Sequence, residues 1–512
     1  MKIGVDVGGT NTDVVILGSE GVLGWHKTPT TEDVFTGVVE AISSTLQKCG
    51  LKTTQIDGVM IGTTQFTNAV IQRKGLLPVG IIRLCLPAAT AVPPLCDWPE
   101  DLSELMGDHQ HLIAGGFEFD GRPISPLDKD ALRRAGRILH QQGIQTLAVT
   151  SVFSPINDEM ERQAAAILRQ EMPGVSVSLS SEVGQYGLLT RENSTIINAS
   201  LVELAQRVVG AFRQALQTLR LKVPFFISQN DGTLMPADDV ARFPVLTFAS
   251  GPTNSLRGAA YLAGVQDAMV ADIGGTTTDI GMLRNGFPRQ STHLVDVGGV
   301  KTNFRMPDVL AIGLGGGSLV TQHGHCVGPE SVGYLLTEQA FCFGGDQLTA
   351  SDIAVAGDWA KLGDKEFLRG LPQEVIKQAR KTMQHMLDRA VERMKTEPKD
   401  LPLIVVGGGG LLIDWPVQAV SEVLQPPYAQ VANAVGAAIA QVSGQIEQIV
   451  TLTESNRSEI LREAQQLAKQ RAIDAGANPE SLEIVEVDLV PISYLPDNPT
   501  RVRIKVVGDL PL

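Results

Sequence analysis

Short apolar runs alternate with amphipathic segments along most of this 512-residue chain. Runs bounded by polar or glycine-rich turns predict strands, and apolar residues at helical spacing predict helices. The predicted strands include Gly58–Ile61, Val79–Ile82, Thr146–Val152 and Leu403–Val406, and the predicted helices include Asp128–Gln142, Asp158–Gln170 and Gln373–Lys395. This alternation is typical of an α/β protein.

Three further features refine the pattern. Asp158 and Glu161 have the spacing of a capping box at a helix start. Leu86–Asp120 is rich in proline and lacks periodicity, which predicts a long surface excursion. Near the C-terminus a polar helix over Glu454–Ala475 precedes two alternating strands, so residues 451–512 are expected to form a small α+β segment.

The most specific pattern is an eight-residue stretch that occurs twice, as DVGGTNTD at 6–13 and DIGGTTTD at 272–279. Each copy lies between two apolar runs, Ile3–Val5 and Val14–Leu17 in the first case, and Met269–Ala271 and Ile280–Leu283 in the second. Apolar runs on both sides of a glycine-rich turn predict a hairpin. A strand leading into four glycines, Gly407–Gly410, is a third glycine-rich element.

Composition narrows the class of protein. The net charge of −14 and the low aromatic content of 5% argue against a nucleic-acid binder. Five scattered cysteines fit reduced thiols rather than a disulfide framework. The chain begins directly with a predicted strand and has no apolar stretch of membrane-spanning length, so we expect a cytoplasmic protein of two or three domains.

Paired glycines expose backbone N–H groups to an anion, and threonine hydroxyls add donors. We therefore predict that both hairpins bind the phosphates of a nucleotide and that the glycine run accommodates its adenosine. The predicted phosphate-binding residues are Gly8, Gly9, Thr10, Asn11, Thr12 and Asp13 in the first hairpin and Gly274, Gly275, Thr276, Thr277, Thr278 and Asp279 in the second. The predicted adenosine-binding residues are Gly407, Gly408, Gly409 and Gly410.

Asp6 and Asp272 are the predicted metal-side and catalytic carboxylates, holding Mg²⁺ directly or through water. Their alternative role is to cap a turn at a strand end. For Asp13 and Asp279, the favoured interpretation is that they fix the hairpins by accepting backbone N–H groups.

Four further residues are candidates for catalysis or substrate binding. Thr63, Thr64 and Asn68 fit a polar loop near the γ-phosphate or substrate, or equally a hydrogen-bonded turn and helix cap. Arg191 is a candidate for orienting an anionic substrate, although a surface or ion-pair role is the commoner one for an arginine.

The ordered series of motifs resembles the hydantoinase A/5-oxoprolinase family, within the superfamily of actin, hexokinase and Hsp70. The matching segments include IGTTQFTNAVIQRKG at 61–75, SSEVGQYGLLTRENSTIINASL at 180–201, SGPTNSLRGA at 250–259, IGLGGGSL at 312–319 and GGDQLTASDIAVA at 344–356. The chain departs from the family pattern at Ile61, where His is usual, and in reading GGTNTD for GGTFTD.

The resemblance implies two RNase H-like domains around a nucleotide cleft. The expected boundaries are an N-terminal family region over 1–190 with the first phosphate loop, a hydantoinase A-like region over 191–450 with the second loop and the adenosine loop, and the segment 451–512. It also implies ATP and Mg²⁺ as cofactors, possible homo-oligomers, and a separate β-type subunit as partner.

The implied activity is ATP-dependent phosphorylation of a cyclic amide, of hydantoin, 5-oxoproline or lactam type, for ring-opening hydrolysis. Three alternatives use the same loops: a small-molecule kinase, an ATP-dependent carboxylase subunit, and a non-enzymatic nucleotide-gated activator.

Overall fold

The computed structural model describes residues 1–512 except residue 10 and residues 31–33, 292–293, 493–498 and 512. The chain forms two compact units, and each unit is assembled from three separate stretches of sequence. The first unit contains residues 1–62, 250–291 and 307–440; the second contains residues 63–249, 292–306 and 441–512. The expected division was sequential, at residues 1–190, 191–450 and 451–512. In the two units of the structure, both glycine hairpins and the glycine run belong to the first unit.

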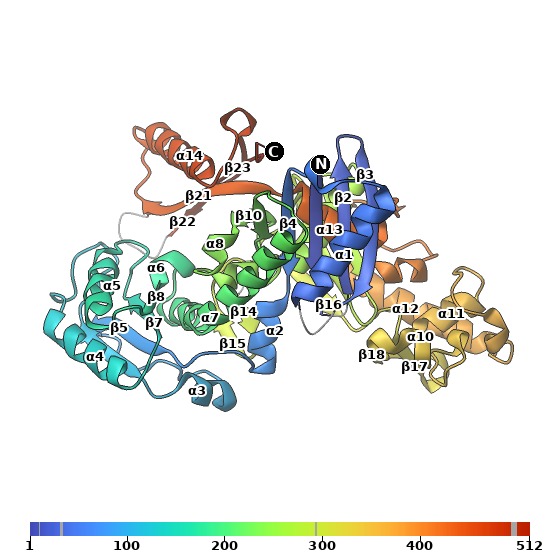
Figure 1. The fold of residues 1–512 in the computed structure, drawn as a ribbon, viewed down its shortest axis with the longest axis horizontal. Coiled ribbons are helices and arrows are strands. Elements are labelled where there is room, and N and C mark those ends of the chain that lie inside the picture. The colour runs from blue at the N-terminus through green and yellow to red at the C-terminus, as the bar shows by residue number, and fades with distance from the viewer. Residues whose placement is uncertain (10, 31–33, 292–293, 493–498, 512) are drawn as a thin grey trace. The chain divides into compact units, whose positions relative to one another are not determined.

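The first hairpin of the first unit is built from strands β1 (Lys2–Val7) and β2 (Asn11–Gly18), which pair antiparallel. Strand β3 (Gly21–Pro29) pairs antiparallel with β2, and β4 (Gly58–Thr63) lies on the other side of β1. Helix α1 (Val34–Cys49) packs against β2 and β3 (Figure 1). The first predicted hairpin is confirmed.

The second hairpin is built from β11 (Ala268–Ile273) and β12 (Thr278–Arg284), again antiparallel. It belongs to a six-stranded sheet whose other strands are β13 (Phe287–Pro288), β16 (Val309–Ile312), β19 (Leu403–Val406) and β20 (Val423–Leu424). Helix α12 (Gln373–Met394) shares a hydrophobic core with β11, and α9 (Ser250–Ala263) packs on β11, β12 and β19.

Helices α9 and α13 (Ala432–Ile439) approach each other so closely that only glycine fits at the crossing. A Cβ on Gly258 would lie 1.8 Å from the Ala432 carbonyl oxygen, and one on Gly436 would lie 1.8 Å from the Asn254 carbonyl oxygen. Helix α13 also packs against β1 and β2, so this crossing joins the first hairpin to the helix that supports the second.

The remaining helices and strands of the first unit are short and share a hydrophobic core with the second hairpin. They are β17 (Ser318–Thr321), β18 (Cys326–Ser331), α10 (Leu336–Gln339) and α11 (Ala350–Ala356). Thr349 is the N-cap residue of α11 and forms a capping box with Asp352.

The second unit contains a four-stranded parallel sheet in the order β6-β5-β7-β8. The strands are β6 (Gln110–Ala114), β5 (Gly80–Leu86), β7 (Thr146–Ser151) and β8 (Ser176–Leu179). Helices α4 (Lys129–Gln141) and α5 (Glu159–Glu171) share its hydrophobic core, and α7 (Leu188–Thr218) packs against β7 and β8. A parallel sheet covered by helices is the expected outcome of the α/β pattern.

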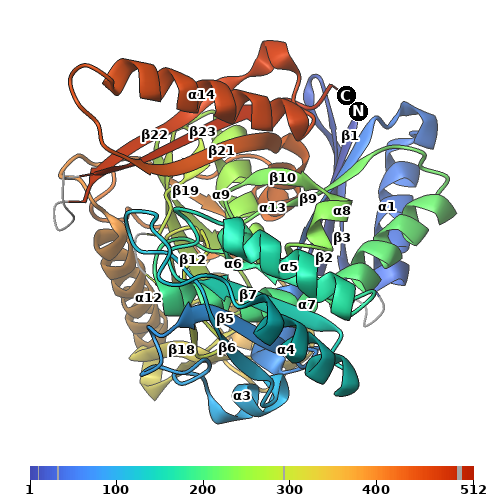
Figure 2. The same ribbon diagram turned by 90° about the vertical axis from the view of Figure 1, so that its left-hand side faces the viewer.

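A second sheet of this unit runs in the order β22-β23-β21-β10-β9. Its strands are β22 (Glu483–Pro491), β23 (Thr500–Gly508), β21 (Gln441–Val450), β10 (Thr233–Pro236) and β9 (Phe225–Ser228). Helix α14 (Arg457–Asp474) lies across β21 and β23 (Figure 2). The C-terminal segment is α+β as predicted, and it joins the rest of this unit through β21.

Smaller elements complete the second unit. They are α2 (Gln65–Gln72), α3 (Glu100–Met106), α6 (Ser180–Val183), α8 (Ala237–Val240), β14 (Val295–Val297) and β15 (Val300–Thr302). No helix in the described part of the chain combines the length and the apolar character that a membrane crossing needs.

Two local predictions are wrong. The stretch Leu86–Asp120 contains α3 and the edge strand β6, and it buries Trp98 and Met106, so it is not a surface excursion. Asp158 does stand before α5, but its side chain caps no backbone N–H and instead contacts Arg162. Glu161 is fully buried and accepts the N–H groups of Ser151 and Ser181, so it is unavailable for a capping box.

The α9–α13 crossing gives a stability prediction. Gly436→Ala should lower the free energy of unfolding by about 3 kcal/mol, because its methyl group meets rigid backbone. Gly210→Ala in α7 is the matched control, since no atom lies within 4 Å of its Cβ position, and it should gain up to about 1 kcal/mol. Thermal unfolding of both variants tests this; equal shifts would contradict the close-packed crossing.

Candidate phosphate-binding site

The two hairpins repeat in geometry as they do in sequence. In the first, Asp6 lies directly opposite Asp13, and in the second Asp272 lies directly opposite Asp279. The Gly8 N–H donates to the Asn11 carbonyl at 3.0 Å, and the corresponding Gly274 N–H donates to the Thr277 carbonyl at 2.8 Å. The strand ends therefore present two equivalent turns, each with a carboxylate pair at its base.

The tips of the turns are exposed while their bases are buried. Gly9, Gly275, Thr276 and Thr277 are exposed, whereas Thr12 and Thr278 are buried. Thr10, predicted to bind phosphate, lies outside the described residues.

The buried hydroxyls at the bases of the turns are already used within the protein. Thr278 Oγ1 donates to the Leu314 carbonyl at 2.6 Å, and Thr12 Oγ1 lies 3.3 Å from the Thr30 hydroxyl. Thr30 in turn donates to the Gly8 carbonyl at 2.8 Å. Any phosphate donors on these turns are thus the exposed backbone and side-chain groups at the tips.

A further glycine segment fixes the orientation of the second turn. The N–H groups of Gly316 and Gly317 donate to the carbonyls of Gly274 and Gly275 at 3.0 and 2.7 Å. A Cβ on Gly315 would lie 2.6 Å from the backbone carbon of Gly275, so the approach requires glycine. The N–H groups of Gly275 and Thr276 belong to exposed residues and have no hydrogen-bond acceptor in the described part of the chain, so they are the candidate anion donors of this turn.

The glycine run Gly407–Gly410 packs against the same hairpin. Gly407 has a φ of +86°, and a Cβ there would lie 2.3 Å from Asp272 Oδ1. A Cβ on Gly409 would lie 2.7 Å from the Gly274 carbonyl oxygen, while Gly408 is exposed with open space at its Cβ position. The structure therefore brings the second hairpin and the predicted adenosine-binding residues together.

The first carboxylate pair is held by two side chains that no sequence motif identified. The Asn433 amide donates to Asp6 Oδ2 at 2.9 Å and to Asp13 Oδ2 at 2.8 Å. Lys27 Nζ lies 2.9 Å from Asp13 Oδ1. Asp13 is thus held by side chains and not by backbone N–H groups as predicted, and within the described residues Asp279 accepts no backbone N–H either.

Asp6 keeps one buried oxygen, Oδ1, without a hydrogen-bond partner among the described residues. A Cβ on Gly62 would lie 2.5 Å from this oxygen and 2.6 Å from Asn254 Nδ2, and the buried Asn254 amide also lacks a partner in the described part of the chain. Burial and then the Asp13 carboxylate raise the pKa of Asp6 to about 7, and Asp272 adds to the increase.

The carboxylates of the second pair, Asp272 and Asp279, also have raised pKa values. Burial raises the pKa of Asp272, against the opposing effects of a hydrogen bond from Ser255 and the charge of Lys27. Burial and then the Asp272 carboxylate raise the pKa of Asp279 to about 7. Asp272 raises the pKa of Asp6, Asp13 raises the pKa of Asp272, and Lys27 lowers both, so the carboxylates of the two hairpins affect one another electrostatically.

The cluster lacks the geometry of an all-protein metal cage. Among the described residues, no group of three or more His, Cys, Asp or Glu side chains is arranged to hold a metal ion. A magnesium ion at Asp6 or Asp272 would therefore depend on phosphate oxygens and water for most of its ligands, which is its usual mode of binding.

Thr63, Thr64 and Asn68 belong to the second unit, at the start of α2. The Gln65 N–H donates to Thr63 Oγ1 at 3.3 Å, and the Asn68 N–H donates to the Thr64 carbonyl at 3.0 Å. These contacts are those of the hydrogen-bonded turn and helix start that was the alternative interpretation. A role in substrate binding stays a prediction.

Arg191, also in the second unit, is 2% exposed and so is not a surface residue. Its guanidinium donates to the Ser180 hydroxyl at 3.0 Å, the Gln185 carbonyl at 3.2 Å and the Ser151 carbonyl at 2.7 Å. These bonds fasten the segment 180–185 to strand β7. In this structure Arg191 positions backbone, and a part in binding a substrate anion stays a prediction.

Comparison with known proteins identifies the family to which this chain belongs. Residues 2–172 match the hydantoinase/oxoprolinase N-terminal region, and residues 191–373 match the hydantoinase/oxoprolinase family. These two regions span most of the chain, so the chain belongs to the hydantoinase/oxoprolinase family, as its motifs indicated.

Individual proteins with similar sequences are consistent with this family assignment. The chain is 28% identical over 433 residues to caprolactamase subunit alpha of Pseudomonas jessenii, covering 77% of this chain and 60% of that protein. It is 27% identical over 392 residues to the acetophenone carboxylase gamma subunit of Aromatoleum aromaticum, covering 69% of this chain and 52% of that subunit. The chain thus spans little more than half of the length of these curated relatives.

A solved structure supports the fold. The crystal structure of ATP-dependent caprolactamase from Pseudomonas jessenii matches with a TM-score of 0.79 at 19% identity, covering 100% of this chain and 89% of that chain. The predicted α/β class is confirmed.

The raised pKa of Asp279 predicts how stability depends on pH. Between the ordinary value of 3.8 and the raised value of about 7, the folded protein holds a proton that the unfolded chain releases, so the free energy of unfolding falls as pH rises through this window. Asp279→Asn removes that charge. It should raise the free energy of unfolding by about 1–4 kcal/mol at pH 8, with little change near pH 4.

Denaturant unfolding at both pH values checks this prediction. Asp346→Asn, at an exposed position in the same unit, is the control and should change neither value. An effect of Asp279→Asn that is the same at both pH values would show that the carboxylate carries no electrostatic penalty.

Proposed function

We propose that this chain is the ATP-dependent subunit of a ring-opening amidase, which phosphorylates a cyclic amide of the hydantoin, 5-oxoproline or lactam type. The observation that carries the proposal is the pair of glycine hairpins with directly opposed carboxylates at their bases, in a member of the hydantoinase/oxoprolinase family. The similarity to a caprolactamase subunit supports the cyclic amide as substrate.

The residues at the hairpins fit a nucleotide and a divalent cation. A bound cation would contact the unpartnered Oδ1 of Asp6 and would reduce the repulsion between the carboxylates. Asp6 and Asp272 would hold Mg²⁺ together with phosphate oxygens and water, and the bound ion would neutralise the charge of the triphosphate. The exposed N–H groups of Gly275 and Thr276 would bind phosphate oxygens, and the bare backbone at Gly408 would accept the adenosine.

An amide carbonyl is a poor electrophile because resonance delocalises the nitrogen lone pair. In the proposed step the amide oxygen attacks the γ-phosphorus, an O–P bond forms, and the bond to the β-phosphate oxygen breaks to release ADP. Phosphorylation makes the amide carbon electrophilic, so water adds to it and the ring C–N bond breaks as the nitrogen takes up a proton and leaves as an amine. The acyl phosphate that remains is hydrolysed by a second water to a carboxylate and free phosphate. Charge neutralisation and positioning by the hairpins supply the catalysis of the transfer.

One alternative has specific support. The similarity to the acetophenone carboxylase gamma subunit favours a carboxylase subunit that activates an oxygen in the same way. The two functions differ in what stimulates ATP turnover: a cyclic amide alone in the first case, and a ketone with bicarbonate in the second.

The carboxylates give the direct test of the nucleotide site. Asp6→Asn and Asp272→Asn should each weaken Mg·ATP binding at least about tenfold and lower turnover about a hundredfold, because a neutral amide cannot replace a metal-side carboxylate. Calorimetry and a turnover assay measure both quantities, with Asp346→Asn as the control. Wild-type affinity and turnover in both variants would remove these residues from the site.

The partner is tested separately. We expect the isolated chain to hydrolyse ATP slowly at most, and a β-type subunit to raise turnover only when a cyclic amide is present, since a closed site excludes water from the γ-phosphate. Mass spectrometry of the products decides this. Ring-opened product from the single chain, formed at a rate that matches its ATP use, would show that no partner is required.

A further inference from the structure

The tip of the second turn is met by a hydroxyl that does not belong to the hairpin. Ser331, the last residue of β18, lies 55 residues further along the chain than Thr276. Its Oγ is 3.4 Å from the Gly275 carbonyl oxygen and 3.4 Å from Thr276 Oγ1. Both contacts are exposed to solvent, so a ligand can reach these atoms.

Backbone bonds hold Ser331 beside the turn. The Gly317 N–H donates to the Gly275 carbonyl at 2.7 Å, and the Val332 N–H donates to the Gly317 carbonyl at 3.0 Å. Gly317 therefore links the turn to the residue that follows Ser331. A Cβ at position 317 would lie 2.9 Å from Ser331 Oγ and 3.0 Å from the Gly275 carbonyl oxygen, so a side chain there would displace the hydroxyl from the turn.

The Ser331 hydroxyl is left as a donor. Its oxygen accepts the Gly333 N–H at 3.0 Å, so its proton must point elsewhere. Among the described residues, its two acceptors both lie at 3.4 Å, which is longer than the range of about 2.5–3.0 Å for an O–H···O bond. One of them, the Gly275 carbonyl, already accepts the Gly317 N–H. The proton is therefore held weakly, and a stronger acceptor can take it.

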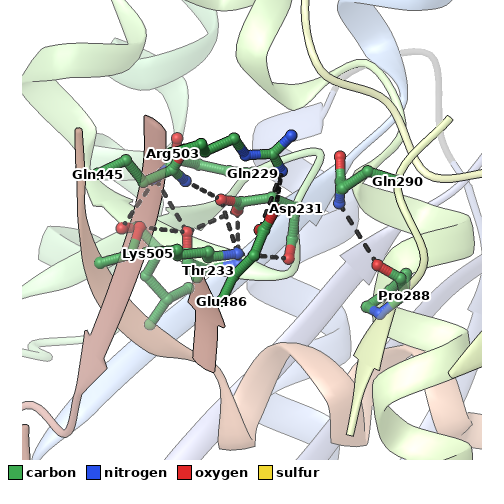
Figure 3. Close-up of polar contacts among 11 residues, drawn as sticks. Gln229, Asp231, Thr233, Pro288, Gln290, Gln445, Glu486, Arg503 and Lys505 are labelled. Atoms are coloured by element: carbon green, nitrogen blue, oxygen red, sulfur yellow. Dashed lines mark hydrogen bonds and ion pairs between the residues drawn. The ribbon is translucent and has the colours of Figure 1, made fainter. Parts of the chain in front are cut away.

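A buried polar cluster in the second unit shows the opposite arrangement. There the Thr233 hydroxyl donates to Asp231 at 2.6 Å, and Lys505 Nζ lies 2.9 Å from the same carboxylate (Figure 3). These groups satisfy one another at short distances, so the Thr233 proton is already committed. The long and exposed contacts of Ser331 leave its proton available to a ligand.

The donors at the tip of the turn suit a phosphate group. They are the hydroxyls of Ser331 and Thr276 and the N–H groups of Gly275 and Thr276, and none of them has a close acceptor among the described residues. Backbone N–H groups of a turn bind anions. A phosphate group presents several strong acceptor oxygens, so it can accept from hydroxyls on two separate segments as well as from the N–H groups.

We propose that Ser331 is a phosphate-binding residue: its hydroxyl donates to the same phosphate group as Thr276 Oγ1 and the N–H groups of Gly275 and Thr276. The proposal rests on the nucleotide site proposed above, and it adds to that site a residue from outside both hairpins. A nucleotide and free phosphate offer the same chemistry, so the experiment has one arm for each.

Calorimetric titration of the full chain with Mg²⁺ and a non-hydrolysable ATP analogue is the first arm. Ser331→Ala should weaken binding of the analogue about tenfold, because it removes a hydrogen bond to a charged group. Ser331→Thr keeps the hydroxyl and should bind within about twofold of the wild type. Ser421→Ala, at an exposed position in the same unit, is the control and should bind as the wild type does.

Thermal unfolding establishes that each variant is folded. If Ser331→Ala is not folded, Ser331→Cys takes its place, because a thiol is nearly the size of a hydroxyl but a weak donor. Unchanged binding of the analogue by the variant that lacks the hydroxyl would overturn the proposal. Equal weakening by Ser331→Thr would also overturn it, because the effect would then follow the change of shape and not the loss of the donor.

Phosphorus NMR titration with inorganic phosphate, without nucleotide, is the second arm. If the turn also holds free phosphate, Ser331→Ala should weaken that binding about tenfold. Phosphate binding that depends on Ser331, in a chain that binds no nucleotide, would contradict the proposed function and leave this assignment standing. Nucleotide binding that is indifferent to Ser331→Ala would do the reverse, and a wild-type chain that binds neither probe would overturn both.

Discussion

The opposition of like charges at the base of two hairpins, buried in the first and half-buried in the second, is the constraint on which the rest of the first unit depends. Asp6 faces Asp13, Asp272 faces Asp279, and the two pairs influence each other. Directly opposed carboxylates destabilise an antiparallel pair, and burial adds the cost of lost hydration. One lysine and two bonds from Asn433 offset only part of this cost. A protein keeps such an arrangement where a bound cation completes it.

The surrounding architecture makes this arrangement rigid. Glycines at 258 and 436 let α9 and α13 touch through their backbones, and α13 carries Asn433 to the first pair. On the other hairpin, glycines at 315, 407 and 409 let two segments approach the turn, and the N–H groups of Gly316 and Gly317 bind its carbonyls. Bare backbone is thus used where these segments approach one another and the second turn. Binding geometry held in this way costs little further ordering when a ligand arrives.

The sequence predicted the parts of this site that are local. Both hairpins, the buried strands and the long helices follow from short patterns of apolar residues and glycine. Asn433 was missed because it reaches the cluster from α13, far along the chain, and carries no motif of its own. Lys27 lies on the neighbouring strand β3 without a motif, and Asn254 lies within the matched segment 250–259 but was not singled out there. The discontinuous units were missed for the same reason as Asn433, since residues 1–62 pack with 250–291 and 307–440. The predicted capping box is absent because the Glu161 carboxylate instead accepts two buried backbone N–H groups, those of Ser151 and Ser181.

We propose that the carboxylates of the hairpins receive the cation of a nucleotide. At pH 7 carboxyls with pKa values of about 7 are half protonated, and a bound cation must expel those protons. Calorimetric titration of the chain with Mg²⁺ and a non-hydrolysable ATP analogue, repeated in buffers of different ionisation enthalpy, counts them. The account predicts net proton release at pH 7 that disappears by pH 9. Binding with no proton release at pH 7 would contradict it.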